Sequence, residues 1–135
     1  MSGFDQATVE ALISRDSYAS LLGIELVSVL DDSITVGLDV GPQHLNFLAV
    51  GHGGMVFSLA DCAFSLGSNS AGPRAVAIDT HLVLTAPALV GDRLEATVTE
   101  ASRGRTLGTY RVEVTRQDSR TLGLFTGTVY ITAMN

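Results

Sequence analysis

Asp61 stands in the middle of the one long helix that the sequence predicts, about Gly53–Ser68. The surrounding Ala, Leu, Met and Phe side chains cover most of the helix circumference, and such a helix is buried on most sides. Desolvating a carboxylate there is costly unless the carboxylate is paired. Buried carboxylates gather at functional sites, which makes Asp61 a candidate base or nucleophile. The alternative is a structural carboxylate satisfied by Ser58, Ser65 or a neighbouring strand.

Small and polar residues interrupt the apolar pattern of this helix at intervals of three and four. They are Gly54, Ser58, Asp61, Ser65 and Ser68. Side chains at this spacing lie on one face of a helix. We therefore expect a narrow polar stripe, which would line a narrow cleft if Asp61 is a base or nucleophile.

The start of the helix is the second unusual feature, because Gly53 and Gly54 follow His52 directly. Without a Cβ, another group can approach the free N–H donors of the first turn closely. Those donors and the positive end of the helix dipole suit an anion or a carbonyl oxygen that gains negative charge. The alternative is a turn that needs only the backbone freedom of glycine.

One helix cannot bring Gly53 and Asp61 to the same carbonyl group. Eight residues at about 1.5 Å each separate them by about 12 Å. Attack on a carbonyl carbon requires an approach of roughly 3–3.5 Å. Two antiparallel copies of the helix, side by side, would place Gly53 of one subunit near Asp61 of the other. If both residues are catalytic, we expect at least a two-fold dimer with two sites across its interface.

Periodicity and turn residues indicate the elements that must hold this helix. Short helices are predicted at Asp5–Arg15 and Tyr18–Leu22, the second with Ser17 as its N-cap and Gly23 as its C-cap. Strands are predicted at Ile24–Leu30, Ile34–Val40, Ala75–Leu84, Arg93–Ala101, Leu107–Arg116 and Leu122–Ala133. This order predicts an α+β fold in which one antiparallel sheet has a single long helix to cover.

The composition of the chain argues against several classes of function. The 135 residues are 46% hydrophobic and 16% charged, which fits one domain over residues 1–135. A net charge of -6, with no lysine, argues against nucleic acid and membrane surfaces as partners. Polar residues break every long apolar run, and the acidic N-terminus is unlike a secretory signal. A single cysteine and no metal-ligand spacing predict a cytoplasmic protein without a metal.

A resemblance to the hotdog-fold acyl-CoA thioesterases, and among them to the phenylacetate-degradation type, rests on one segment. That segment is His52-Gly53-Gly54-Met55-Val56-Phe57-Ser58-Leu59-Ala60-Asp61-Cys62-Ala63-Phe64, with Asn46 upstream and Asn69-Ser70 downstream. The similarity extends over nearly the whole chain, from Leu22-Gly23-Ile24 to Phe125-Thr126-Gly127-Thr128-Val129. It implies a long helix wrapped by a curved antiparallel sheet, and dimers with paired helices that usually form homotetramers.

The resemblance also implies roles for single residues. Asp61 would activate water as a base or attack as a nucleophile, and the Gly53 backbone N–H would polarise the thioester carbonyl. Asn46 would orient the water or the carboxylate, while His52 would fix the loop before the helix. Neither metal nor redox cofactor is needed for this hydrolysis, because coenzyme A is part of the substrate.

Substrate contacts are expected from several further residues. An apolar pocket between the helices, near Phe57 and Leu45, would take the acyl group, and Gly54 is a further candidate for substrate binding. Ser65 stands where this subtype more often carries alanine and related aryl-CoA thioesterases a hydroxyl, so it bears on water position and acyl preference. Arg103 and Arg105, in one predicted hairpin loop, are candidates for the phosphates of coenzyme A. The alternative for both arginines is a solvated surface charge.

Three functions follow, of which hydrolysis of aryl-acetyl or short- to medium-chain acyl-CoA is the main prediction. An acyl-thioester hydratase or dehydratase would need His52 or His44 in the cleft. A non-catalytic acyl-CoA sensor would use Asp61 only to satisfy an interface. His44 and His81 are predicted to be hydrogen-bonded surface residues, and Cys62 a buried core thiol.

Overall fold

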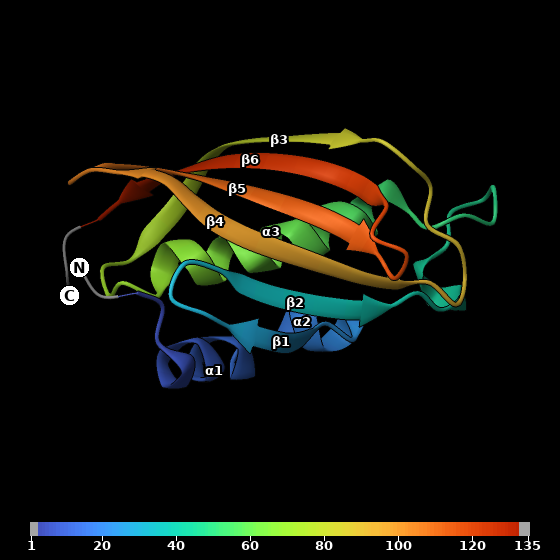
Figure 1. Cartoon of the computed structure of the whole chain (residues 1–135), viewed down its shortest axis with the longest axis horizontal. Coiled ribbons are helices and arrows are strands. Elements are labelled where there is room, and N and C mark those ends of the chain that lie inside the picture. The colour runs from blue at the N-terminus through green and yellow to red at the C-terminus, as the bar shows by residue number, and fades with distance from the viewer. Residues whose placement is uncertain (1–2, 133–135) are drawn as a thin grey trace.

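A computed structural model describes residues 3–132, in which one six-stranded antiparallel sheet curves around a long helix (Figure 1). The elements are α1 (Gln6–Ser14), α2 (Ser17–Leu22), β1 (Glu25–Val29), β2 (Ile34–Asp39), the 3-10 turn η1 (Pro42–His44), α3 (Gly53–Asn69), β3 (Ala75–Leu84), β4 (Arg93–Arg103), β5 (Leu107–Arg116) and β6 (Thr121–Ile131). The strand order is β1-β2-β4-β5-β6-β3. This is the α+β arrangement that the sequence predicts.

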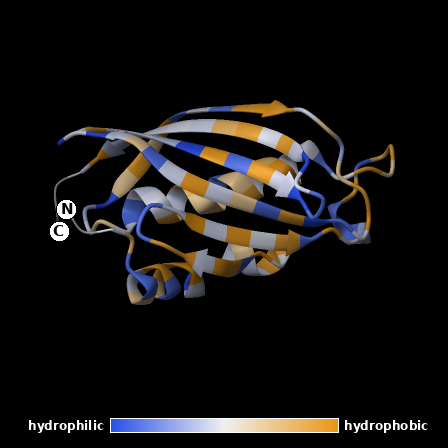
Figure 2. Cartoon of the chain, in the orientation of Figure 1, coloured by the Kyte–Doolittle hydropathy of each residue, from blue (hydrophilic) through white to orange (hydrophobic). Residues whose placement is uncertain are grey.

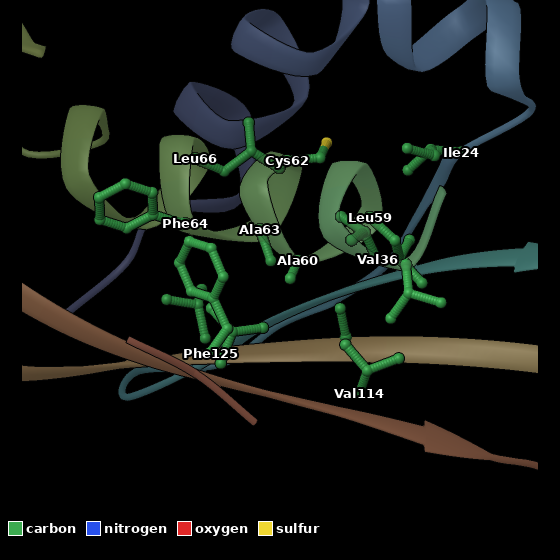
Figure 3. Close-up of a cluster of buried hydrophobic side chains, with 14 of the residues drawn as sticks. Ile24, Val36, Leu59, Ala60, Cys62, Ala63, Phe64, Leu66, Val114 and Phe125 are labelled. Atoms are coloured by element: carbon green, nitrogen blue, oxygen red, sulfur yellow. The ribbon is translucent and has the colours of Figure 1, made fainter. Parts of the chain in front are cut away.

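The core lies between α3 and the inner face of the sheet. Along β4 and β5, buried and more exposed residues alternate, and Figure 2 shows the matching alternation of hydrophobic and hydrophilic positions. Figure 3 shows Ala60, Ala63 and Phe64 directed from α3 toward Phe125 on the sheet. The rings of Phe64 and Phe125 meet with centroids 5.4 Å apart. Packing against the sheet therefore holds α3 in place along its length.

The two edges of the sheet differ. Helix α1 packs on β1 at one edge, whereas β3 at the other edge pairs only with β6 among residues 3–132. Strand β3 is long for an edge strand, and its apolar side chains Val76, Ile78, Val83 and Leu84 are 45–59% exposed. A long apolar edge of this kind is a template for pairing with another chain.

Most predicted elements are confirmed to within a few residues, and two details are wrong. The N-cap of α2 is Asp16 rather than Ser17, because the Asp16 carboxylate accepts a hydrogen bond from the Ala19 N–H at 2.9 Å. Arg103 belongs to β4 instead of a loop, since its pairing with β5 continues to Gly108 past a bulge. Gly23 is confirmed as the C-cap of α2, with φ at 82°. The predicted end of the last strand at Ala133 lies outside the described residues.

No helix in residues 3–132 combines the length and hydrophobicity needed to cross a membrane.

Candidate active site

His52 caps the start of α3 and uses one of the helix's free donors. Its Nδ1 accepts the Gly54 N–H at 2.8 Å, while its backbone N–H donates to the His44 carbonyl at 2.7 Å. The N–H of the preceding residue, Gly53, has no acceptor within residues 3–132. The structure thus leaves at Gly53 an amide that can bind an external oxygen, and His52 holds the loop before it.

Neighbouring atoms leave little space for a side chain at either glycine of this helix start. A Cβ at Gly53 would lie 3.1 Å from Leu84 Cδ1, and one at Gly54 would lie 3.0 Å from His52 Nδ1. Leu84 is the last residue of β3. The free amide of Gly53 is therefore next to the exposed edge of the sheet.

Asn46 shapes the loop that leads to α3. Its Oδ1 accepts the N–H of Leu48 at 2.9 Å and that of Val50 at 3.4 Å, and Ala49 takes a positive φ of 62° to close the turn. The side-chain amide group of Asn46 donates no hydrogen bond within residues 3–132. It remains available to a water or a carboxylate, as the predicted orienting role requires.

Asp61 is half-buried on α3 and accepts no hydrogen bond from residues 3–132. Ser58, one predicted structural partner, donates instead to the Gly54 carbonyl at 2.8 Å. Burial raises the pKa of Asp61 above its usual value, and the nearby Asp16 carboxylate raises it further. Such a carboxyl group has a higher affinity for a proton than an exposed aspartate, which suits a general base.

The polar stripe of α3 is open over only part of its predicted length. Gly54 is exposed, and Ser58, Asp61 and Ser65 are each partly exposed. Ser68 is buried, with 1% of its surface accessible. The open stripe therefore runs from Gly54 to Ser65 and has Asp61 within it.

Phe57 lies beside this stripe on α3. Its half-buried ring meets the ring of Phe125 edge-on, with centroids 5.6 Å apart. The Phe57 ring thus presents a partly exposed apolar surface next to the stripe, where an acyl group is expected.

The two arginines predicted to contact coenzyme A differ in their environment. Arg103 donates from one guanidinium nitrogen to the Ser68 carbonyl at 3.0 Å and to the Tyr110 hydroxyl at 2.7 Å. It therefore caps the carbonyl end of α3, where a cation is favourable. Arg105 is exposed. Both lie at the opposite end of α3 from Gly53.

His44 is buried, and the prediction that it lies on the surface is wrong. Its Nδ1 accepts the Gly41 N–H at 2.9 Å, so the proton is on Nε2, which donates to the Leu22 carbonyl at 2.8 Å. With both nitrogens engaged, His44 cannot serve the hydratase mechanism. Burial raises the pKa of Cys62 to about 12, and this confirms Cys62 as a neutral core thiol. His81 is exposed on β3.

A family comparison covers the segment that carries this geometry. The model of the Thioesterase superfamily matches residues 49–122, more than half of the chain, including both Gly53 and Asp61. The chain belongs to the thioesterase superfamily. The family, the hotdog fold and the reaction class predicted from the sequence are thereby confirmed.

Individual relatives are also similar to this chain over most of their length. The chain is 37% identical to the acyl-coenzyme A thioesterase PaaI of Escherichia coli, over 87% of this chain and 84% of the relative. The structure of the E. coli PaaI protein matches with a TM-score of 0.91 and 34% identity, over 96% and 94% of the two chains. A hypothetical thioesterase of Streptococcus pneumoniae, crystallised with coenzyme A, matches with a TM-score of 0.78 and 25% identity, over 83% and 88%.

Sequence reasoning missed the approach of α2 to the polar stripe of α3. The Tyr18 hydroxyl lies 3.0 Å from Ser58 Oγ, and Asp16 is close enough to affect Asp61. Tyr18 and Ser58 are 40 positions apart, and neither helical periodicity nor capping patterns relate residues at that separation. The approach of α2 to α3 is known only from the folded chain.

Proposed function

We propose that the chain hydrolyses acyl-CoA thioesters to a free acid and coenzyme A, at sites shared between two copies of the chain. The observation that carries this proposal is a pair of unsatisfied groups on α3, the Gly53 N–H and the Asp61 carboxylate. The first suits a developing oxyanion and the second suits a base or nucleophile. Supporting comparisons are the E. coli relative named as an acyl-coenzyme A thioesterase and the S. pneumoniae structure with coenzyme A.

The proposed reaction begins with the thioester carbonyl oxygen at the Gly53 N–H. Attack on the carbonyl carbon moves electron density onto that oxygen, and one well-placed donor stabilises the resulting charge by about 3–4 kcal/mol. Asp61 of the partner subunit takes a proton from the attacking water, or attacks directly and is released by water in a second step. In both routes the C–S bond breaks, and the coenzyme A thiolate leaves and takes up a proton.

The site requires a second copy of the chain, and we propose that β3 pairs with β3 of the partner. The exposed apolar edge of β3 ends at Leu84, against Gly53, so a partner on this edge reaches the free amide. Pairing of the two edges would satisfy the free backbone groups of β3 and set the two α3 helices side by side. The proposed assembly is a homodimer that associates further into a homotetramer.

Substrate selectivity is proposed to come from residues around the open stripe. The partly exposed Phe57 ring would pack against an aryl-acetyl or a short- to medium-chain acyl group, with Gly54 nearby and Ser65 beyond Asp61. Arg105 is the better placed arginine for a phosphate, because Arg103 already caps α3. We propose phenylacetyl-CoA as a substrate and the cytoplasm as the site of action.

The test is release of coenzyme A from phenylacetyl-CoA and hexanoyl-CoA, followed with a thiol reagent. Wild-type protein should turn over, and Asp61→Asn, which keeps the shape but cannot act as a base, should lose activity by orders of magnitude. Full activity in Asp61→Asn would refute the proposed role of Asp61. Binding of acyl-CoA by the wild type without any thiol release would indicate a sensor instead.

A further inference from the structure

The first turn of α2 lies against the polar stripe of α3. The Tyr18 hydroxyl and Ser58 Oγ are 3.0 Å apart, and Ser58 Oγ is 2.8 Å from the Gly54 carbonyl. Because the single hydroxyl proton of Ser58 goes to that carbonyl, Tyr18 is the donor in the first bond. A chain of two hydrogen bonds therefore runs from α2 to the first turn of α3, where the Gly53 amide is also placed.

Asp16 brings a charge to the same region. It is the N-cap of α2, and the buried Ala19, which donates to the Asp16 carboxylate, anchors the helix. Asp16 caps the turn of α2 that carries Tyr18, and Tyr18 contacts Ser58, about one turn before Asp61 on α3. From this position the Asp16 charge raises the pKa of both Asp61 and Cys62. No cation in residues 3–132 offsets this repulsion at Asp61.

The polar groups on the side of Asp61 come from α2 and α3. From α2 they are the Asp16 carboxylate and, through its contact with Ser58, the Tyr18 hydroxyl. From α3 they are the Ser58 and Ser65 hydroxyls and the neutral Cys62 thiol. Among residues 3–132, Asp16 is the charged group that contributes to the pKa of Asp61.

We propose that the first turn of α2 supplies positioning residues to the two shared sites, Tyr18 to the site that contains Gly53 of its own chain and Asp16 to the site that contains Asp61 of its own chain. Tyr18 acts through Ser58 on the turn of α3 that begins at Gly53, and Asp16 sets the electrostatic environment of Asp61. This inference rests on the proposed function, because it takes Asp61 to be the catalytic base.

The charge of Asp16 predicts a direction for the pH dependence. A like charge disfavours the ionised form of Asp61, and only the ionised form can act as a base. Activity should therefore fall on the acid side as Asp61 takes up its proton. Removing the Asp16 charge lowers the pKa of Asp61 and moves this acid limb to lower pH.

The first experiment compares Asp16→Asn with Asp5→Asn in the full-length protein. Asparagine caps a helix about as well as aspartate, so both variants should keep their helices. Asp5 caps α1 in the same way but does not contribute to the pKa of Asp61. The acid limb of kcat/KM should move to lower pH in Asp16→Asn and remain in place in Asp5→Asn. An unchanged profile in Asp16→Asn would overturn the role of Asp16.

The second experiment is a double-mutant cycle of Tyr18→Phe and Ser58→Ala. Loss of the Tyr18 hydroxyl should lower kcat/KM by about two- to tenfold, the range for one hydrogen bond. The same change should have no further effect in the Ser58→Ala background, where its partner is missing. An equal effect of Tyr18→Phe in both backgrounds, or none in either, would overturn the role of Tyr18.

Different results would contradict the proposed function and the inference about α2. If Asp61→Asn remains active, the proposed function itself is wrong. If Asp61→Asn is inactive while Asp16→Asn keeps the wild-type pH profile and the cycle is additive, the function stands and α2 has no part in catalysis.

Discussion

At the scale of single residues, two polar groups of the site are distinguished by having no hydrogen-bond partner among residues 3–132. The polar groups around Gly53 and Asp61 are hydrogen-bonded to one another: His52 to Gly54, Ser58 to Gly54, and Asn46 to its own loop. The Gly53 N–H and the Asp61 carboxylate are exceptions within residues 3–132. Groups held in place by their surroundings and left unsatisfied are ready to interact with a substrate.

Substitutions of Gly53 can separate the contribution of its N–H to activity from the contribution of its small size. Gly53→Pro removes the N–H donor, and proline is favoured at the first position of a helix. The residue before a proline prefers an extended backbone, which His52 already has, with φ at -64° and ψ at 135°. We expect kcat to fall by about 100- to 1,000-fold. The melting temperature should change little.

Gly53→Ala is the matched control, since it adds a Cβ near Leu84 and keeps the N–H. Its kcat should stay well above that of Gly53→Pro. Equal kcat values for the two variants would show that crowding at Leu84, and not the lost donor, is responsible.

At the scale of elements, close packing between α3 and β6 sets the position of the site. A Cβ at Gly127 would come within 2.9 Å of both the Phe64 and the Phe125 rings, which are buried and have little room to move. We expect Gly127→Ala to lower the free energy of unfolding by about 1–3 kcal/mol. Denaturant titration measures this change.

Gly104→Ala provides the comparison for that prediction. Gly104 has no positive φ, and the nearest atom to a Cβ there, the Leu107 carbonyl oxygen, is 3.7 Å away. Its free energy of unfolding should stay close to that of the wild type. A stability loss as large in Gly104→Ala would contradict packing against Phe64 as the cause.

The elements themselves could be predicted from the sequence because their signals are local. Alternation in β5 and the apolar run of α3 indicate the type and extent of each element. The errors arise where local signals compete. Asp16 and Ser17 are both good N-caps, and the Arg-Gly-Arg sequence at 103–105 is typical of a turn although Arg103 still pairs with Gly108.

The candidate site was predictable only in part, for a related reason. Gly53 and Asp61 stand out because glycine and aspartate are unusual in an apolar helix. The burial of His44 depends on its contact with Leu22, and the position of Tyr18 against α3 depends on its contact with Ser58. Such pairings between distant segments form only when the chain is folded, and a single sequence does not record them.

At the scale of the whole molecule, the proposed dimer depends on β3. Ile78 is 59% exposed on this edge strand, and a lysine there would place a charge in the interface. We expect Ile78→Lys to shift the mass measured by light scattering toward the 14.1 kDa of one chain and to abolish turnover. Leu30→Lys, at a similarly exposed position beyond β1, should keep the wild-type mass and activity. A fully active Ile78→Lys monomer would contradict a shared site.

Mixed assemblies test the shared site directly. When Gly53→Pro and Asp61→Ala chains associate, one of the two sites in a mixed dimer receives Gly53 from one chain and Asp61 from the other, and both are intact. The second site carries both substitutions. Random association makes half of the dimers mixed, so an equimolar mixture should recover about a quarter of the wild-type activity, although each variant is nearly inactive. Mass spectrometry under native conditions verifies the mixed species, and their inactivity would contradict a site shared between Gly53 of one chain and Asp61 of the other.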